Sequence, residues 1–341
     1  MTVAAETAQR RRRSVVAPAV LAAALLGAAV LLSLAIGARS VPIAEVWAAF
    51  SAPELDSTDQ AAVLSRVPTA ITGLLVGAAL GVGGALMQGM ARNPLADPGL
   101  LGVNAGAALF VVLGMSVMGV QQPFGVVWLA FAGAAAAVAF GYGAAAASPG
   151  GATPVTLALT GAAITALAGS GIAAIVIADE ATLDRYRFWQ LGSLTGAPPQ
   201  TLAQLGGFLV LGLAVAVFCS GKLNALALGD DAARGLGVRV GLVRVMSAAA
   251  VVLLCGTATA LAGPIGFVGL AVPHAVRAFA GTDYRRIVPL SAAVGAAFLL
   301  ACDIIGRLIA RPGILEVGLV TAAVGAPIFI VLLRRGRMVG V

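Results

Sequence analysis

Long apolar segments alternate with short polar segments along most of the 341-residue chain. The first apolar segment runs from Val15 to Ile36, and nine more follow, each near the length of about 20 residues at which a helix crosses a bilayer. They occupy residues 67–90, 100–120, 124–147, 154–178, 203–220, 243–262, 266–282, 287–306 and 316–334. This pattern predicts an all-α membrane protein with ten transmembrane helices. The segment 266–282 has the weakest signal, because Pro273, His274 and Arg277 lie near one of its ends.

The basic residues predict how these helices are oriented. Arg10–Arg13 precede the first apolar segment, which is longer than the 7–15 residues of a signal-peptide core, so we expect an uncleaved first helix with a cytoplasmic N-terminus. Alternation from there places 15 of the 21 basic residues on the cytoplasmic side, as the positive-inside rule requires. The expected organisation is a cytoplasmic tail at 1–14, a transmembrane domain at 15–335 and a cytoplasmic tail at 336–341.

Composition agrees with a membrane protein and restricts its chemistry. Hydrophobic residues make up 60% of the chain and charged residues 10%, whereas soluble domains contain about a quarter charged residues. Cys219, Cys255 and Cys302 lie in apolar segments, where a free cysteine behaves as a small hydrophobic residue. His274 is the only histidine, which excludes a site within this chain that needs several histidine ligands.

The most polar interruption of the second half is the segment 226–242, which we expect on the cytoplasmic side. Gly229 precedes Asp230 and Asp231, and carboxylates stabilise the N-terminus of a helix through its dipole and its unpaired amides. Asp230 and Arg234 are four residues apart, so they can pair on one helix face.

The same segment has an apolar face and a stop signal. Leu228, Ala232 and Leu236 follow helical spacing on a second face. Gly235 and Gly237 then favour a turn before the chain returns to apolar sequence. The pattern therefore predicts a short amphipathic cytoplasmic helix, with a solvated loop as the alternative.

Small residues recur at helical spacing within the predicted spans. Gly73, Gly77 and Gly81 form two consecutive GxxxG steps, and Gly102 with Gly106 forms another. Lipid provides little hydrophobic drive between helices, so close backbone approach at small residues stabilises their packing. We expect these glycines to act in helix packing.

Several functional classes are disfavoured by what the sequence lacks. It contains no GxxxxGK[ST] motif, so we expect no nucleotide site. No ionisable residue lies near the middle of a predicted span, whereas ion-coupled transporters keep such residues at depth. A membrane enzyme would need a catalytic dyad or metal ligands, which the pattern does not supply. Uphill transport would therefore need energy from another subunit, with an ion-coupled secondary transporter or channel as the alternative class.

Several short motifs point to a known family. They are RVP at 66–68, LVGAAL at 75–80, MQG at 87–89, RNPLADPGLLG at 92–102, LGDDAARGLGV at 228–238, AGPIGFVGL at 262–270, PH at 273–274 and GAP at 325–327. Over about residues 36–335 the chain resembles the FecCD family, the permeases of type II ABC importers for iron–siderophores, haem and cobalamin. The resemblance implies the ten-helix fold of those permeases.

The resemblance also implies partners and a role for the segment 226–242. The expected partners are a second permease subunit, identical or paralogous, two cytoplasmic ABC ATPases that bind ATP and Mg²⁺, and an extracytoplasmic solute-binding protein. The chain itself is expected to have no cofactor and no enzymatic activity. The polar segment matches the helix that couples to the ATPase, at positions Leu228, Gly229, Asp230, Asp231, Arg234, Leu236 and Gly237.

Two further sites are implied by the same resemblance. Arg66 and Arg307 match arginines that pair with glutamates of the binding protein, whereas a third such arginine would fall at Thr69. The alternative is that both arginines only mark the interface, with Arg307 paired to Asp303. A cytoplasmic gate is expected at 93–95 and at about 154–156, with Asn93, Leu95 and Val155 as its residues.

These expectations define a function. The chain is expected to be a permease of the bacterial cytoplasmic membrane, multi-pass with both termini cytoplasmic, that moves a ferric siderophore inward. Cobalamin and haem are the alternative cargoes, because the motifs do not separate them. His274 is expected to be a hydrogen-bonded structural group and not a haem or metal ligand.

Overall fold

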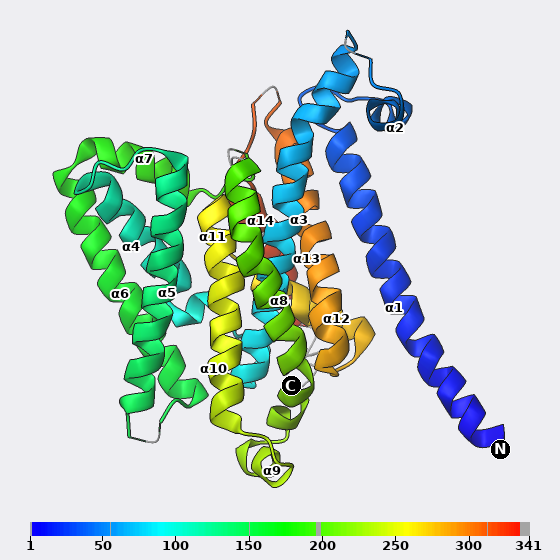
Figure 1. The fold of residues 1–341 in the computed structure, drawn as a ribbon, viewed down its shortest axis with the longest axis vertical. Helices are drawn as coiled ribbons and strands as arrows, with labels where there is room; N and C mark the ends of the chain where they lie inside the picture. Colours follow the sequence, from blue (N-terminus) through cyan, green and yellow to red (C-terminus); the bar gives the residue numbers. More distant parts are fainter. Residues whose placement is uncertain (1, 55, 150, 196–198, 312, 335–341) are drawn as a thin grey trace.

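The computed structural model describes residues 2–54, 56–149, 151–195, 199–311 and 313–334, and its regular structure there is helical throughout. Figure 1 shows most of the long helices side by side in one bundle, from which α1 slants away toward its N-terminus. In order they are α1 (Thr2–Ala35), α2 (Ile43–Ser51), α3 (Thr58–Ala91), η1 (Pro98–Leu101), α4 (Val103–Ser116), α5 (Pro123–Ala147), α6 (Pro154–Ala178), α7 (Glu180–Gln190), α8 (Pro199–Ala227), α9 (Asp230–Gly235), α10 (Val240–Val251), η2 (Val252–Gly256), α11 (Thr257–Ala262), α12 (Val268–Ala280), α13 (Tyr284–Ile309) and α14 (Val317–Arg334).

Each predicted span coincides with a helix or, for 243–262, with the continuous run α10–η2–α11. Helix α1 is continuous from Thr2, so residues 2–14 of the expected tail at 1–14 are helical, while 336–341 lies outside the described residues. Helix α3 begins nine residues before the predicted start at 67, because Ser57 caps its N-terminus by accepting a hydrogen bond from the Gln60 amide. Helices α2 and α7 lie outside the apolar segments, so the apolar pattern does not predict them.

Length separates the helices into two groups. Among the described residues, seven helical segments are long and apolar enough to cross a membrane, and three apolar ones are shorter: Val103–Ser116, Val268–Ala280 and Val317–Ile328. The shorter three coincide with predicted spans. The structure therefore establishes a multi-pass helical membrane protein, and the count of ten spans stays a prediction.

Helix α3 lies at the centre of the bundle and packs against α8, α12 and α13 (Figure 1). A Cβ atom added at Gly77 would lie 2.5 Å from the Gly295 carbonyl oxygen, and one at Gly81 would lie 2.2 Å from that of Ser291. At Gly106 the Gly133 oxygen would be 2.4 Å away. These approaches confirm that Gly77, Gly81 and Gly106 let helix backbones touch, whereas Gly73 and Gly102 face the side chains of Leu300 and Ile164.

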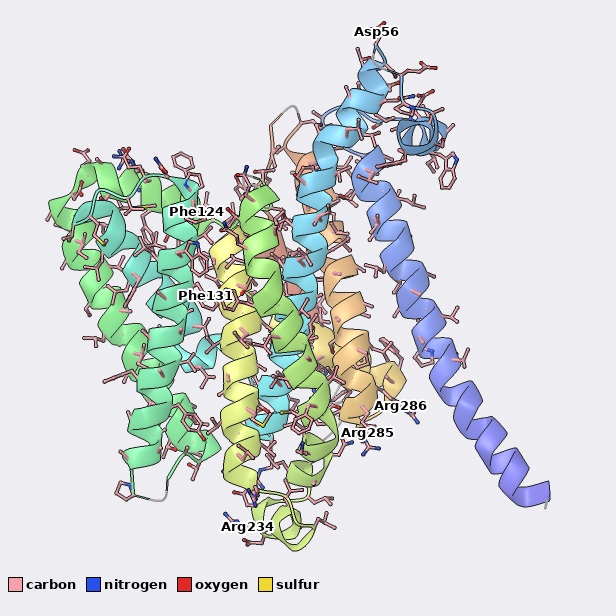
Figure 2. The ribbon with its side chains drawn as sticks, viewed as in Figure 1. Asp56, Phe124, Phe131, Arg234, Arg285 and Arg286 are labelled. Carbon is pink, nitrogen blue, oxygen red and sulfur yellow. The ribbon has the colours of Figure 1, made fainter. Side chains whose placement is uncertain are left out.

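The two ends of the bundle differ. Helix α9 lies at one end, and α2 and α7 lie at the other (Figure 1). Arg234, Arg285 and Arg286 all project at the α9 end, whereas Asp56 lies at the α2 end (Figure 2). The segments expected to be cytoplasmic are thus gathered at one end of the molecule.

Candidate functional site

Helix α9 is the short helix that the sequence predicts. It begins at Asp230 after Gly229, whose φ of 103° suits only glycine, and it ends at Gly235. Gly237, with φ 77°, reverses the chain by donating its amide hydrogen to the Arg234 carbonyl. Glycines therefore bound the helix on both sides.

The apolar face of α9 points away from the bundle. Leu228 and Leu236 are 67% and 64% exposed, and Ala232 is also exposed, whereas Ala233 is fully buried against the bundle. The two leucines therefore project from the same end of the molecule as the exposed Arg234 (Figure 2).

The ion pairs of α9 differ from the predicted one. The prediction of an Asp230–Arg234 pair is wrong: Arg234 Nη1 lies 2.8 Å from Asp231 Oδ1, three residues apart. Asp230 instead faces inward, and its Oδ1 lies 3.0 Å from Arg244 Nη2 and 3.6 Å from Arg92 Nη2. The helix exposes the side that holds Asp231 and Arg234, so Asp230 is available to α3 and α10.

Arg244 on α10 connects this aspartate to the loop before α6. The residue is 7% exposed, and its Nη1 donates a hydrogen bond of 3.3 Å to the Ala152 carbonyl. Arg92 ends α3 in a left-handed conformation, φ 47°. No local spacing relates Asp230 to either arginine, so only the tertiary structure reveals this cluster.

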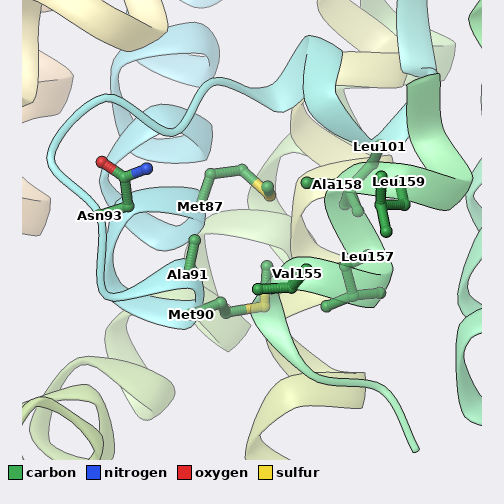
Figure 3. A pocket seen from close by; sticks show the side chains of 9 residues that line it. All are labelled: Met87, Met90, Ala91, Asn93, Leu101, Val155, Leu157, Ala158 and Leu159. Carbon is green, nitrogen blue, oxygen red and sulfur yellow. The ribbon is translucent and has the colours of Figure 1, made fainter. Parts of the chain in front are cut away.

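A cavity of about 390 Å³ lies between the end of α3 and the start of α6. Figure 3 shows its wall, which consists of Met87, Met90, Ala91, Asn93, Leu101, Val155, Leu157, Ala158 and Leu159. Asn93 and Val155, two of the three predicted gate residues, therefore lie on the same cavity. Leu95 does not appear among the described lining residues; its amide donates a 2.9 Å hydrogen bond to Asn93 Oδ1 in the adjoining turn.

The cavity is apolar and lies at the surface of the chain. Of the lining side chains that the structure describes, Asn93 alone is polar (Figure 3). Met87 and Met90 are buried, whereas Val155 and Leu159 are 68% and 66% exposed. The flexible, polarisable methionine side chains suit an adaptable wall.

At the opposite end, the two predicted docking arginines hold the C-terminus of α1. Arg66 donates to the Leu34 carbonyl at 2.7 Å and to the Arg39 carbonyl at 2.6 Å. Arg307 donates to the carbonyls of Ser33 at 2.9 Å and Ile36 at 3.2 Å. Carbonyls at the end of a helix lack partners within it, and a cation there also favours the helix dipole.

The two arginines differ in exposure. Arg307 is 6% exposed and forms an ion pair with Asp303 one turn earlier, as the alternative interpretation expects. Arg66 is half-buried. Thr69, at the position of the third family arginine, is also half-buried, and the exposed Arg311 contacts Ser40 Oγ at 3.2 Å.

A buried polar network near the α9 end is absent from the sequence prediction. Arg277 donates to Gln88 Oε1 and, at 2.9 Å, to the Tyr284 hydroxyl, and all three residues are at most 2% exposed. The Tyr284 amide donates to Asn224 Oδ1 at 2.8 Å, which ties α13 to α8. The hydrogen bond expected for His274 is not found, because its buried Nδ1 has no partner among the described residues.

The fold and these surfaces define a multi-pass helical membrane protein with an exposed amphipathic helix at one end. The chain belongs to the FecCD transport family, whose model matches residues 25–335. It is 43% identical over 329 residues to the ferric enterobactin transport system permease protein FepD of Escherichia coli, covering 95% of this chain and 96% of FepD. It is 41% identical to the Fe(3+)-citrate import system permease protein YfmD of Bacillus subtilis, covering 90% and 91%.

This chain is also similar in fold to a solved structure. It is described as an inward-facing conformation of a metal-chelate type ABC transporter, with a TM-score of 0.81 and 27% identity. The match covers 92% of this chain and 97% of that chain. The family membership and the fold thus agree over nearly the whole length.

Proposed function

We propose that this chain is the permease subunit of an ABC importer that moves a ferric siderophore inward across the bacterial cytoplasmic membrane. The observation that supports this most strongly is similarity over at least 90% of the chain, at 43% and 41% identity, to permeases named for ferric enterobactin and Fe(3+)-citrate. The chain acts as a transport path without its own nucleotide site or cofactor, and partner ATPases bind ATP and Mg²⁺.

The proposed topology has ten spans with both termini in the cytoplasm. The three shorter apolar helices α4, α12 and α14, added to the seven long helical segments, make up the ten spans of this topology. The α9 end is cytoplasmic, which is supported by the exposed arginines of that end, such as Arg234 and Arg285. The α7 end faces the binding protein.

The proposed contact with the ATPase is helix α9. An amphipathic helix that inserts its apolar side into a groove is a common mode of protein recognition. The exposed Leu228 and Leu236 supply the apolar side, and the pair of Asp231 and Arg234 supplies polar groups beside it. ATP-driven closure of the ATPases then moves this helix.

The proposed gate is the apolar cavity between α3 and α6. Its exposed residues Val155 and Leu159 face outward from the chain, so a second permease subunit, an identical copy or a paralogue, is needed to close the path around them. Asn93 and Leu95 shape the turn on the α3 side of this gate.

The proposed docking site for the binding protein lies at the end of α1. Arg66 is half-exposed, and its guanidinium, which already donates to the Leu34 and Arg39 carbonyls, has further hydrogens for a carboxylate, a pairing that fixes orientation. Arg307 is buried and supports this end by holding the Ser33 and Ile36 carbonyls. The docking contribution of Arg307 is therefore indirect.

Cellular uptake tests the cargo. A strain without this gene would be supplied with iron-labelled siderophores, labelled haem or labelled cobalamin, with rescue by the wild-type chain. We expect loss of uptake of a ferric siderophore, restored by rescue. A selective loss of haem or cobalamin uptake would instead show one of the alternative cargoes.

A second assay tests the class of transporter. Purified chain alone in vesicles should not concentrate a ferric siderophore under an ion gradient, because the energy comes from the ATPases. Uphill uptake without ATP or partner subunits would show an ion-coupled secondary transporter and contradict the proposal.

A further inference from the structure

Asp230 is placed differently from the other charged residues of α9. Its carboxylate faces the bundle, with Arg244 at 3.0 Å and Arg92 at 3.6 Å. The neighbouring Asp231 has a side chain that is 99% exposed, and its ion pair within the described part of the chain is with Arg234 of its own helix. The side chains of the adjacent Asp230 and Asp231 therefore point to opposite sides of α9.

Arg92 and Arg244 are each connected to one wall of the cavity at the end of α3. Arg92 stands between Ala91 and Asn93, both of which line the cavity. Arg244 donates to the Ala152 carbonyl, three residues before Val155 on the opposite wall. One carboxylate is thus linked to both sides of the same cavity.

The ion pair between Asp230 and Arg244 is largely shielded from solvent. The side chains are 9% and 25% exposed, whereas those of Arg234 and Asp231 are 62% and 99% exposed. Reduced exposure lessens screening by salt and solvent, so the inward pair interacts more strongly than the outward pair. Arg244 also uses two nitrogens on two different partners, which the fork of a guanidinium allows.

We propose that Asp230 is the positioning residue that links movement of α9 to the width of the α3–α6 cavity, through Arg92 on one wall and Arg244 on the other. The inference rests on the proposed contact between α9 and the ATPase. Glycines 229 and 237 have positive φ on either side of the short helix, so that it joins α8 and α10 through turns and not through continuous helix. A shift of Asp230 then moves the C-terminal end of α3 and the loop before α6 together.

The test uses the complete importer with its ATPases in lipid nanodiscs. A Val155→Cys chain, first shown to transport, reports the cavity by its rate of reaction with a polar maleimide, with and without ATP. The native Cys219, Cys255 and Cys302 are at most 1% exposed and provide a low background. ATP hydrolysis is measured on the same samples.

We expect Asp230→Asn to reduce the ATP-dependent change in labelling by about fivefold or more, the range of ordinary allosteric coupling, while ATP hydrolysis continues. Asp231→Asn removes the same charge from the same helix, so a difference between the two variants isolates the inward contacts. Asp184→Asn, which breaks an exposed pair with Arg187 on α7, is the unaffected control. Asp230→Glu should restore most of the response, because it keeps the charge.

A second substitution keeps the proposal testable if Asp230→Asn does not assemble. Arg244→Lys retains a cation for Asp230 but not the second bond to Ala152, so the labelling response should fall while the ATPases remain bound. An unchanged response in both Asp230→Asn and Arg244→Lys would overturn the proposal.

The proposed contact of α9 with the ATPase is tested separately. Leu228→Glu with Leu236→Glu should release the ATPases from the purified complex. If they stay bound and active, the contact itself is wrong; if they are released while Asp230→Asn responds normally, only the role of Asp230 is wrong.

Discussion

The two ends of this protein both use arginines to hold a neighbouring element, but the groups that these arginines contact on α1 and on α9 differ. At the α1 end, Arg66 and Arg307 bind backbone carbonyls, whose positions are set by the helix itself. At the α9 end, Arg92 and Arg244 bind the carboxylate of Asp230, which belongs to a six-residue helix between two glycines.

This difference has a mechanical consequence. Bonds from a buried guanidinium to helix-end carbonyls fix two long helices to each other, so the α1 end should behave as a rigid platform. In the proposed mechanism, α9 moves with the ATPase and its ion pairs carry Arg92 and Arg244 with it. The comparison predicts that substitutions at the α1 end reduce stability, whereas those at the α9 end reduce coupling.

The largest stability effect is expected from Arg307→Met. It leaves Asp303 as a buried charge without its partner, a change that costs about 3 kcal/mol or more, and it also frees the Ser33 carbonyl of α1 and the Ile36 carbonyl just after it. Thermal unfolding in detergent measures the loss. Replacing both residues, Arg307→Met with Asp303→Leu, should recover most of it, because an apolar pair needs no desolvation of charge. Equal destabilisation by the single and double variants would contradict this.

The next effect concerns binding-protein docking. Arg66→Glu should weaken association with the extracytoplasmic binding protein about tenfold, equivalent to about 1.4 kcal/mol, because it reverses the charge offered to a carboxylate. Binding to nanodiscs measures the change. Ser65→Glu is the matched control, since it adds a negative charge one residue earlier at an exposed site. Unchanged affinity and transport with Arg66→Glu would remove the docking assignment.

A smaller effect is expected from Arg92→Gln. The ion pair between Arg92 and Asp230 is longer, at 3.6 Å, than the one between Arg244 and Asp230. Its side chains are 35% and 25% exposed, so its loss should lower the free energy of unfolding by less than about 1 kcal/mol. Arg244→Gln should cost more, because that side chain is more buried. The same unfolding assay ranks the two variants, and the reverse order would show that the contact with Arg92 dominates.

The smallest effect is a pH dependence at the turn before α13. Burial raises the pKa of Asp283, but hydrogen bonds from Asn224 and the Arg285 amide, together with the charges of Arg286 and Arg285, lower the pKa on balance. A lowered pKa in the folded state gives stability above the ordinary value of 3.8 that is lost as the pH falls below it. Asp283→Asn should therefore be less stable than wild type near neutral pH, and the difference should shrink below pH 3.8. A constant difference across that range would contradict the assignment.

Much of the fold follows from the sequence by itself. The apolar segments give the helices and their order, because a chain in lipid must satisfy its backbone within each segment. The glycine spacing predicts where backbones touch, and at Gly77 and Gly81 they do. Gly229, Gly235 and Gly237 fix the bounds of α9, since stop signals are local.

What the tertiary structure decides is which charged groups meet. Local spacing favours a pair between Asp230 and Arg234, yet packing turns Asp230 toward Arg92 and Arg244, whose positions in the sequence give no sign of it. The role of Arg307 likewise depends on the end of α1 lying beside α13. Such contacts join distant segments, and an ion pair depends on distance and exposure in space, which periodicity along the chain does not encode.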